Sequence, residues 1–582
     1  MPTRVVRVKV LFDARARIAA LLWLVKPRVV GGDLGQATVR VVPRDLRRRV
    51  DELDATHDDE ECGCDWRHTC ASHQSMGGAS HVIARDGRYG EVTEDDVKHF
   101  VRCVGGDAAG VVVSTSATAT NLQDGGGDAL DKYNVDWMGK YHGRSRVAVL
   151  PKTTEELSAI MARCHARNLA VVPQGGNTGL VGGGVPAHDE VVVNLGRMNA
   201  IVSIDEDAGV SVVEAGVVLE ELESAVRARG MTVPLDLGAK GKCQMGGCVS
   251  TNAGGLRLLR YGSLRGSVLG LEVVLANGEV LDLLRTLRKD NTGYDLKQLF
   301  IGAEGTLGIV TKIAILTPRA PTNVNVALFG LDSFASCVEL LKLARGRLGE
   351  ILSAFEFFDR ESLDLVLEQL KGTRDPLAKP CPFYVVVETS GSVKSHDNAK
   401  LQAFLKIVKN KRVIVDGVVG KDEKHAFALW TLRERISVAL KYAGAVYKYD
   451  ISLPTARMYN LVTTLRARLA PQFGSGVKVL GYGHLGDGNL HLNISCAEYT
   501  DALERAIEPF VYEYTRDERG SVSAEHGLGI MKAEEIIYSK DAKAVELMGA
   551  MKRALDPRGI LNPYKVLPAS TRAAALVPMS KL

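Results

Sequence analysis

The sequence carries little net charge and contains no long apolar run. Its 73 Lys and Arg residues against 69 Asp and Glu residues leave a formal net charge of +4 over 582 residues, which gives no argument for a nucleic-acid partner. No RNP, zinc-finger or helix-turn-helix pattern is present either. The longest fully apolar run near the start, residues 18–25, is too short to cross a bilayer. We therefore expect a soluble protein with no membrane span.

Cysteine is also sparse, and internal repeats are absent. Ten cysteines scattered over 582 residues do not form the dense framework of a secreted disulfide protein, so a reducing or organellar compartment is expected. A chain of this length that is 46% hydrophobic and 24% charged can build two or three globular domains with substantial cores.

The two ends of the chain predict different compartments. Residues 1–49 hold twelve basic residues against three aspartates, a transit-peptide composition that favours the mitochondrial matrix. The C-terminal Ser580-Lys581-Leu582 instead matches a peroxisomal targeting signal. We expect residues 1–90 to be a basic, disordered leader. A zinc site there stays open but is disfavoured, because no usual zinc pattern has the spacing of Cys62, Cys64, His68, Cys70 and His73.

Capping and periodic patterns predict helices and strands from about residue 93 onward. Thr93 to Asp96 resembles a helix cap, Thr153 with Glu156 forms a capping box, and residues 107–130 are expected to be a loop. The predicted helices end near 104 and 167 or cover residues 332–345, 359–370 and 425–441. The predicted strands cover residues 147–150, 169–172, 190–195, 269–275, 279–283, 383–388 and 446–453. Residues 318–321, bounded by two prolines, are expected to link two domains.

Glycine-rich stretches follow several of the predicted strands. Residues 173–184 suit a loop whose backbone N–H groups surround an anion such as a pyrophosphate. This stretch is neither a P-loop nor a good Rossmann fingerprint, because Pro186 and a strand replace the expected helix. Similar stretches lie at residues 234–255 and 302–310. Each alone is consistent with a flexible loop, but together they suggest a long polyanionic ligand lying against exposed backbone.

The stretch from Val477 to Ile494 predicts a β-hairpin around an Asp-Gly turn. His484 closes its first strand and His491 lies early in the second, so the turn brings the two imidazoles together. Two hairpin histidines are commonly structural. Glu525 and His526, which follow a short predicted strand, make a metal site the favoured interpretation. His484, His491 and Glu525 would form a His2Glu set with one open coordination position, as in catalytic zinc sites, and His526 would stand beside the ion.

Spacing gives weaker signals at other positions. Asn493 projects to the same face of its strand as the second histidine. Lys448 and Asp450 share one side of another predicted strand. Arg433 and Ser437, four residues apart in a predicted helix, share a face, but a helix-face arginine is usually solvated. Spacing alone therefore does not single out Arg433.

Several of these stretches occur in a recognisable order. PQGGNTGLVGG, TNAGG, GAEGTLGIVT, GYGHLGDGNLHLN and SAEHGLG resemble the FAD-linked 2-hydroxyacid dehydrogenases of the vanillyl-alcohol-oxidase superfamily, over residues 130–567. The runs DLGAKGKCQMGG, NTGYDLKQLFIG, LRERIS, VYKYDISLP and ILNPYKVLP narrow the resemblance to members that oxidise D-2-hydroxyglutarate.

The resemblance implies an α+β fold with a two-subdomain FAD-binding domain of the PCMH type. An α+β cap domain would cover the flavin ring, and a C-terminal segment would return to the FAD domain. The expected boundaries are 1–90 for the leader, 91–320 for the FAD-binding domain, 321–500 for the cap, 501–568 for the C-terminal segment and 569–582 for the tail.

The resemblance also implies the flavin contacts. Some relatives tether FAD through a histidine in the first glycine loop, but residues 173–184 contain neither His nor Cys, so we expect non-covalent FAD. The implied contact residues are Gly175, Gly176, Asn177, Thr178, Gly179, Gly246, Gly247, Thr251, Asn252, Gly254, Gly255, Ile309 and Asn562.

The remaining site residues follow from the same resemblance. It implies that zinc or another divalent metal is bound by His484, His491 and Glu525, and that substrate is bound by Arg433, Ser437, Lys448, Asn493 and His526. A metal on the substrate hydroxyl would lower its pKa, and His526 would accept the proton as general base while hydride leaves C2 for the flavin. Arg433 and Lys448 would hold a second, distal carboxylate.

These expectations combine into one predicted activity, the FAD-dependent, metal-assisted oxidation of D-2-hydroxyglutarate to 2-oxoglutarate. Electrons would pass to an external acceptor, for which electron-transfer flavoprotein is expected, or to oxygen in a peroxisome. A D-lactate or glycolate dehydrogenase is the nearest alternative, and a non-catalytic phosphate-binding protein with a structural His2Glu set is a more distant one. A homodimer stays open.

Overall fold

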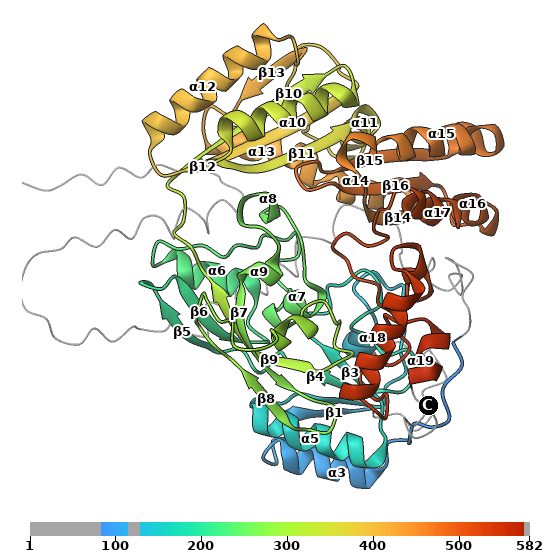
Figure 1. Ribbon diagram of the computed structural model, residues 1–582. Helices are drawn as coiled ribbons and strands as arrows, with labels where there is room; N and C mark the ends of the chain where they lie inside the picture. The colour runs from blue at the N-terminus through green and yellow to red at the C-terminus, as the bar shows by residue number, and fades with distance from the viewer. Residues whose placement is uncertain (1–82, 115–128, 576–582) are drawn as a thin grey trace, which may run out of the picture. The chain divides into compact units, whose positions relative to one another are not determined.

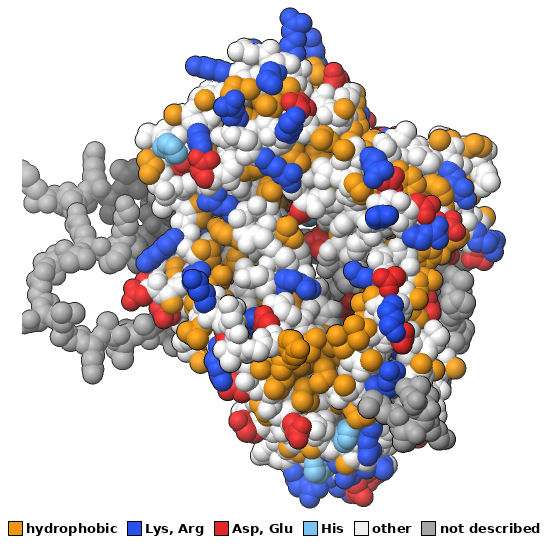
Figure 2. Space-filling model, viewed as in Figure 1, with side chains coloured by type: hydrophobic (Ala, Val, Ile, Leu, Met, Phe, Trp, Pro, Cys, Tyr) orange, Lys and Arg blue, Asp and Glu red, His pale blue; other side chains and the backbone are white. Residues whose placement is uncertain are grey.

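The computed structural model describes residues 83–114 and 129–575. The basic leader, the Cys62 to His73 set and the terminal Ser580-Lys581-Leu582 lie outside the described residues. The described residues belong to one compact unit. In the described ranges, no helix combines the length and the apolar character needed to cross a membrane. Figure 2 shows Lys and Arg side chains interspersed with Asp and Glu over the visible face.

The first sheet has four strands in the order β1-β2-β4-β3, of which β2, β4 and β3 run parallel. Helices α3 (Glu94–Cys103) and α5 (Thr154–Arg167) begin at the predicted threonine caps. The strands are β1 (Val111–Val113), β2 (Val147–Val149), β3 (Val171–Gln174) and β4 (Val191–Asn194). The prediction of a loop over residues 107–130 was therefore wrong at β1, where three valines pair with β2.

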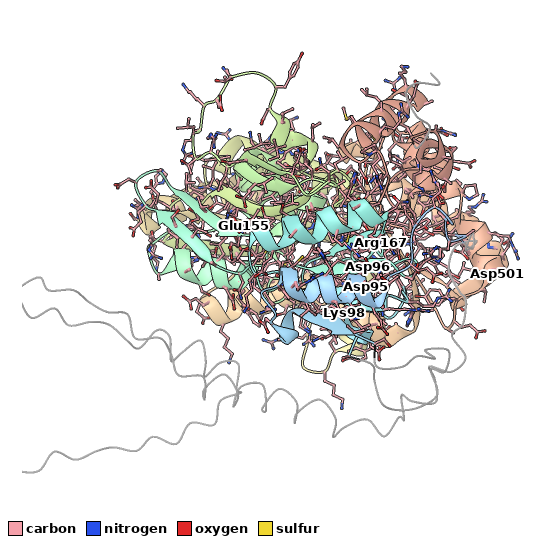
Figure 3. The ribbon with its side chains drawn as sticks, turned by 90° about the horizontal axis from the view of Figure 1, so that it is seen from below. Asp95, Asp96, Lys98, Glu155, Arg167 and Asp501 are labelled. Atoms are coloured by element: carbon pink, nitrogen blue, oxygen red, sulfur yellow. The ribbon has the colours of Figure 1, made fainter. Side chains whose placement is uncertain are left out.

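Helix α3 is fastened to α5 by one buried carboxylate. Asp96 accepts hydrogen bonds from the backbone and hydroxyl of Thr93, which complete the capping box, and forms ion pairs with Arg163 and Arg167. Figure 3 shows Asp96 on α3 directed toward Arg167 on α5. Although burial opposes ionisation, these donors lower the pKa of Asp96 to about 2.

The second sheet is antiparallel, with the order β5-β6-β9-β7-β8. The strands predicted over residues 269–275 and 279–283 are confirmed as β7 and β8, which pair with each other as a hairpin. Helices α6 (Leu219–Arg227) and α7 (Met245–Thr251) bury apolar residues in the core of this sheet. The strands are β5 (Ile201–Asp205), β6 (Val210–Glu214), β7 (Val268–Val274), β8 (Val280–Leu283) and β9 (Ile309–Leu316).

The third sheet follows residues 317–322 and has seven antiparallel strands in the order β13-β10-β12-β11-β15-β16-β14. Because side chains alternate along a strand, it builds a core on each face. Its strands are β10 (Asn323–Leu331), β11 (Leu352–Asp359), β12 (Phe383–Gly391), β13 (Asp416–Val419), β14 (Ala445–Ser452), β15 (Lys478–His484) and β16 (Asn489–Cys496). Figure 1 shows β14, β15 and β16 together at one end of this sheet.

Helices cover both faces of the seven-stranded sheet. One face packs against α10 (Phe334–Leu348), α12 (Lys394–Asn410), α15 (Asn460–Phe473), α16 (Asp501–Ile507) and α17 (Phe510–Asp517). The other packs against α11 (Arg360–Gln369), α13 (Glu423–Glu434) and α14 (Ile436–Ala443). The single helix predicted over residues 425–441 was wrong, since the chain breaks at Arg435, where φ is -86° and ψ is 5°. Arg433 and Ser437 consequently lie on two different helices.

The C-terminal segment returns to the first sheet. Residues 520–533 are irregular, and the short strand predicted before Glu525 is only an isolated bridge between Ser452 and Ser521. Helix α18 (Ala542–Leu555) follows, and Leu561 then forms a parallel bridge with Val171 at the edge of β3. The buried Lys565 ammonium donates to the carbonyls of Gly183 and Val185. This late segment is therefore bonded to the first glycine loop.

Candidate active site

Three imidazoles converge on one carboxylate oxygen at the turn of the β15–β16 hairpin. The Oε1 atom of Glu525 lies 3.7 Å from Nε2 of His484, 3.6 Å from Nε2 of His491 and 4.0 Å from Nε2 of His526. Two of these histidines come from neighbouring strands, while Glu525 and His526 come from the irregular segment after α17. The structure thus brings together the four residues that the sequence suggested for a metal and its neighbouring base.

The donor set suits a divalent metal. Zinc bonds of 2.0–2.1 Å in a tetrahedral site place neighbouring ligand atoms about 3.4 Å apart, close to the observed separations. Two neutral nitrogens and a carboxylate are a common ligand set for catalytic zinc. The set whose ligand atoms all lie within 4.8 Å of one another is Asp450, His491, Glu525 and His526. It shares His491 and Glu525 with the predicted set but has Asp450 and His526 in place of His484.

Burial and pairing set the charges of these ligands. Burial lowers the pKa of His491 to about 3, which keeps its imidazole neutral and able to donate a lone pair. For His484, burial lowers the pKa, but the carboxylates of Glu356 and Glu525 outweigh it and raise the pKa well above its ordinary value. For Glu525, burial raises the pKa, but His484 and His491 lower it to about 2. A metal would replace a proton held between imidazole and carboxylate, as metal sites commonly do.

Glu356 stands behind this site on β11, and sequence reasoning missed it. Glu356 pairs with His484 across β11 and β15, and its Oε1 lies 2.8 Å from Nδ1 of that histidine. Its Oε2 forms an ion pair with Nη2 of Arg433 at 2.9 Å. The only sequence signal was an acidic residue inside the apolar run of residues 352–358, where a buried charge needs partners.

Asp450 supports the opposite side of the site from β14. Its carboxylate accepts hydrogen bonds from the backbone N–H groups of Glu525 and His526, both at 2.9 Å, and from Nδ2 of Asn489 at 2.8 Å. Its Oδ2 lies 3.5 Å from Nδ1 of His526. Although burial opposes it, the nearby histidines lower the pKa of Asp450, so the carboxylate stays ionised beside His526.

Apart from His526, the residues expected to bind substrate differ in their surroundings. Arg433 is buried, its guanidinium carbon lies 4.8 Å from the centre of the Tyr482 ring, and its Nε has no hydrogen-bond partner in the described chain. Lys448 pairs with Asn493 across β14 and β16. Ser437 is exposed, and its hydroxyl donates to the carbonyl of Glu434.

Lys140 adds a positive charge that the sequence gave no reason to select. Burial lowers the pKa of Lys448, and repulsion from Lys140 and Lys441 lowers it further. Among the described residues, neither Lys140 nor Lys448 forms an ion pair, although Glu508, Glu504 and Asp136 interact with Lys140 at longer range and no carboxylate does so with Lys448. This side of the site therefore favours an anion.

The glycine stretches expected to bind flavin meet at the edge of the first two sheets. A Cβ atom on Gly176 would lie 1.9 Å from the carbonyl oxygen of Lys242, so only glycine permits this approach of the two loops. The backbone N–H groups of Gly176, Thr178 and Gly179 donate to no acceptor within the described ranges. Such donors fit a pyrophosphate.

Two buried amide side chains next to these loops also lack partners. The Oε1 atom of Gln244, beside Gly175, and the Oδ1 atom of Asn562 have no hydrogen-bond partner in the described chain. Gln244 immediately precedes α7, whose first turn contains Gly246 and Gly247. Unpaired buried polar atoms are rare unless a ligand satisfies them, so the cradle fits FAD.

The flavin loops and the metal residues contact each other directly. A Cβ atom on Gly254 would lie 2.9 Å from both Cβ and Oε2 of Glu525. Glu304, in another glycine stretch, accepts hydrogen bonds from the N–H groups of Leu528 and Gly529, just after His526. A metal held by Glu525 would consequently lie next to the ligand of these loops.

Known proteins are similar to this chain in both sequence and fold. The FAD binding domain family matches residues 145–284, and the C-terminal domain of FAD linked oxidases matches residues 320–566. A mitochondrial D-2-hydroxyglutarate dehydrogenase from Arabidopsis thaliana is 58% identical over 443 residues, which are 76% of this chain and 78% of that protein. A putative mitochondrial D-lactate dehydrogenase from Schizosaccharomyces pombe is 48% identical over 83% of this chain and 92% of its own length.

A solved structure of p-cresol methylhydroxylase with substrate bound has the same fold. Its TM-score is 0.62 at 16% identity, over 82% of this chain and 98% of that one. The predicted α+β architecture with a PCMH-type FAD-binding fold is thereby confirmed. The chain belongs to the FAD-linked oxidase family, in the group whose members are named D-2-hydroxyglutarate dehydrogenase, and it is an enzyme of that family.

Proposed function

We propose that this enzyme oxidises D-2-hydroxyglutarate to 2-oxoglutarate with FAD and a divalent metal, for which zinc is the best candidate. The observation that carries the proposal is the convergence of three imidazoles on Glu525, directly against the Gly254 loop. Relatives with the same activity in their names support the substrate. The proposed metal ligands are His484, His491 and Glu525.

The chain's own residues account for the movement of the proton. A metal held by His484, His491 and Glu525 would supply a Lewis acid that lowers the pKa of the substrate hydroxyl, and FAD held by the glycine loops would supply the hydride acceptor. His526 takes the hydroxyl proton at Nε2, the nitrogen that faces Glu525. Asp450, 3.5 Å from Nδ1 of His526, stabilises the imidazolium that results.

The cations beside the metal residues favour a dicarboxylate. Arg433 presents a buried N–H with no acceptor among the described residues, and Lys448, which Lys140 and Lys441 repel, forms no ion pair with a carboxylate there. One carboxylate of D-2-hydroxyglutarate would lie at the metal with the hydroxyl, and the distal one would bind Arg433 and Lys448. Asn493, which pairs with Lys448 across β14 and β16, would also contact the distal carboxylate. Ser437 would lie at the edge of this binding site.

The flavin is proposed to bind non-covalently. The contacts are those of the glycine stretches: Gly175, Gly176, Asn177, Thr178, Gly179, Gly246, Gly247, Thr251, Asn252, Gly254, Gly255, Ile309 and Asn562. Acid precipitation should release all flavin into the supernatant. Flavin that stays with the precipitated protein would contradict this part of the proposal.

The cellular setting follows from the relatives and the leader composition. We propose a mitochondrial location, since the relatives above are named mitochondrial, with electron-transfer flavoprotein as acceptor. The domain limits of 91–320, 321–500 and 501–568 remain proposals, although the change of sheet falls between β9 and β10. A homodimer is a further proposal, which gel filtration with light scattering tests.

A D-lactate dehydrogenase is the second candidate, because the Schizosaccharomyces pombe relative carries that name with a "putative" prefix. Anaerobic mixing of the yellow enzyme with D- and L-hydroxy acids, with and without a chelator, separates the candidates. We expect D-2-hydroxyglutarate to bleach the flavin fastest and the chelator to slow the bleaching. Faster bleaching by D-lactate would favour the second candidate, and bleaching that the chelator does not affect would contradict the metal.

A further inference from the structure

We propose that Glu356 is a positioning residue that fixes the metal ligand His484 and the substrate cation Arg433 in one rigid arrangement. The inference rests on the proposed function, because it assigns a role to a residue behind both groups. Glu356 is 2% exposed in the middle of the seven-stranded sheet, and each of its carboxylate oxygens serves a different partner.

The first oxygen determines which nitrogen of His484 is available. The Nδ1–H of His484 donates to Oε1 of Glu356 at 2.8 Å, so a neutral imidazole carries its proton there and leaves the lone pair on Nε2. Nε2 faces Oε1 of Glu525 at 3.7 Å, where the metal would lie. A carboxylate behind a ligand histidine fixes both its tautomer and its orientation, and its loss typically weakens metal binding.

The second oxygen holds the guanidinium of Arg433. Oε2 of Glu356 lies 2.9 Å from Nη2, an ion pair that lacks the alignment of a hydrogen bond, and the guanidinium lies over the ring of Tyr482. The planar group is thus held from two directions, and its Nε–H is left without a partner in the described chain. Because an unpaired buried donor is unfavourable, a substrate carboxylate oxygen at this position would satisfy it.

A second buried glutamate in the same sheet provides a matched control. Glu388, on β12, is 5% exposed and is likewise held by an arginine, Arg257, with further hydrogen bonds from Ser353 and the indole of Trp430. It contacts none of the proposed ligands of metal or substrate. Glu388→Gln therefore reports what the loss of a buried, arginine-paired carboxylate does to this sheet alone.

The test compares Glu356→Gln, Glu356→Asp and Glu388→Gln in the FAD-loaded enzyme. Zinc affinity is measured by competition with a fluorescent chelator, and KM and kcat are measured for D-2-hydroxyglutarate and D-lactate. We expect both Glu356 variants to bind zinc 10- to 100-fold more weakly and Glu388→Gln to bind zinc like the wild type. The KM of the Glu356 variants should rise more for D-2-hydroxyglutarate than for D-lactate, because only the former needs Arg433.

A His484→Ala background makes the test specific. If Glu356 acts through His484, Glu356→Gln should weaken zinc binding no further once that imidazole is gone. Wild-type zinc affinity in the Glu356 variants, or an equal loss in Glu388→Gln, would overturn the inference and leave the proposed function standing. A wild-type enzyme that binds no zinc would instead overturn the metal part of the proposed function.

Discussion

The metal region and the flavin region lie in contact but are built from different parts of the polypeptide. The metal region uses buried ionisable side chains at one end of the seven-stranded sheet, with carboxylates behind them, such as Glu356 behind His484. The flavin region uses backbone N–H groups that glycine exposes, such as those of Gly176 and Gly179. Substitutions should therefore separate the two: side-chain truncations should remove the metal and leave the flavin, and added methyl groups in glycine loops should do the reverse.

The largest expected effect tests the metal region alone. His491→Ala should lower kcat about 10³-fold, because a catalytic metal supplies several kcal/mol of stabilisation. Bound zinc, measured by atomic emission, should fall with it, and flavin absorbance should not change. Loss of flavin together with zinc would show that the two regions are not separable.

The next effect concerns substrate choice within the metal region. Arg433→Ala should lower kcat/KM for D-2-hydroxyglutarate about 10²-fold, the value of one strong hydrogen bond to a charged group, and should affect D-lactate much less. Arg435→Ala is the matched control, since this exposed arginine lies two residues away at the break between α13 and α14. Equal losses on both substrates would contradict a distal-carboxylate role for Arg433.

A third substitution tests the flavin region. Gly176→Ala places a methyl group against the carbonyl of Lys242, so the loops must separate, at about 1–3 kcal/mol of folding free energy. The purified variant should contain much less flavin and keep its zinc affinity. Gly238→Ala, where a Cβ would meet nothing within 4 Å, should keep its flavin. Full flavin occupancy in Gly176→Ala would argue against this loop as the pyrophosphate site.

The smallest expected effect concerns a residue outside both regions. It tests whether a substitution elsewhere in the fold leaves the metal and flavin regions unchanged. Asp96 has a pKa of about 2 in the folded protein against an ordinary value of 3.8, so it stabilises the fold above pH 4 and loses that contribution as the pH falls toward 2. Asp96→Asn should lower the free energy of unfolding by about 2 kcal/mol at pH 7 and by much less near pH 2. Denaturant titrations at both pH values measure the difference. Zinc and flavin contents should match those of the wild type.

The sequence predicted the features that depend on local patterns. The threonine cap at Thr93, the hairpin that carries His484 and His491, and the pairing of β7 with β8 follow from residues close together in the chain. Prediction from the sequence failed where the structure depends on contacts between segments that are distant in the chain. Glu356 reaches His484 only because β11 happens to lie beside β15, and three valines form β1 only because β2 offers an edge.

The break at Arg435 shows a further limit of local patterns. Apolar periodicity continues through residues 425–441, so nothing in it predicts two helices. The break nevertheless decides which side chains can share the site, since Arg433 is buried next to Glu356 while Ser437 stays exposed. The resemblance to known enzymes named both residues, but only the three-dimensional arrangement distinguishes their surroundings.

The bridge between Leu561 and Val171 has a consequence for the folding of the enzyme during its synthesis. β3 is the outer strand of its sheet, and its free edge is capped by residues made almost 400 positions later, while Lys565 ties the same late segment to the loop after β3. A ribosome that stalls or terminates before residue 560 would release a chain with an uncovered strand edge, prone to aggregate. The proposed flavin contact Asn562 belongs to the same late segment, so the proposed flavin site stays incomplete until that residue has been made.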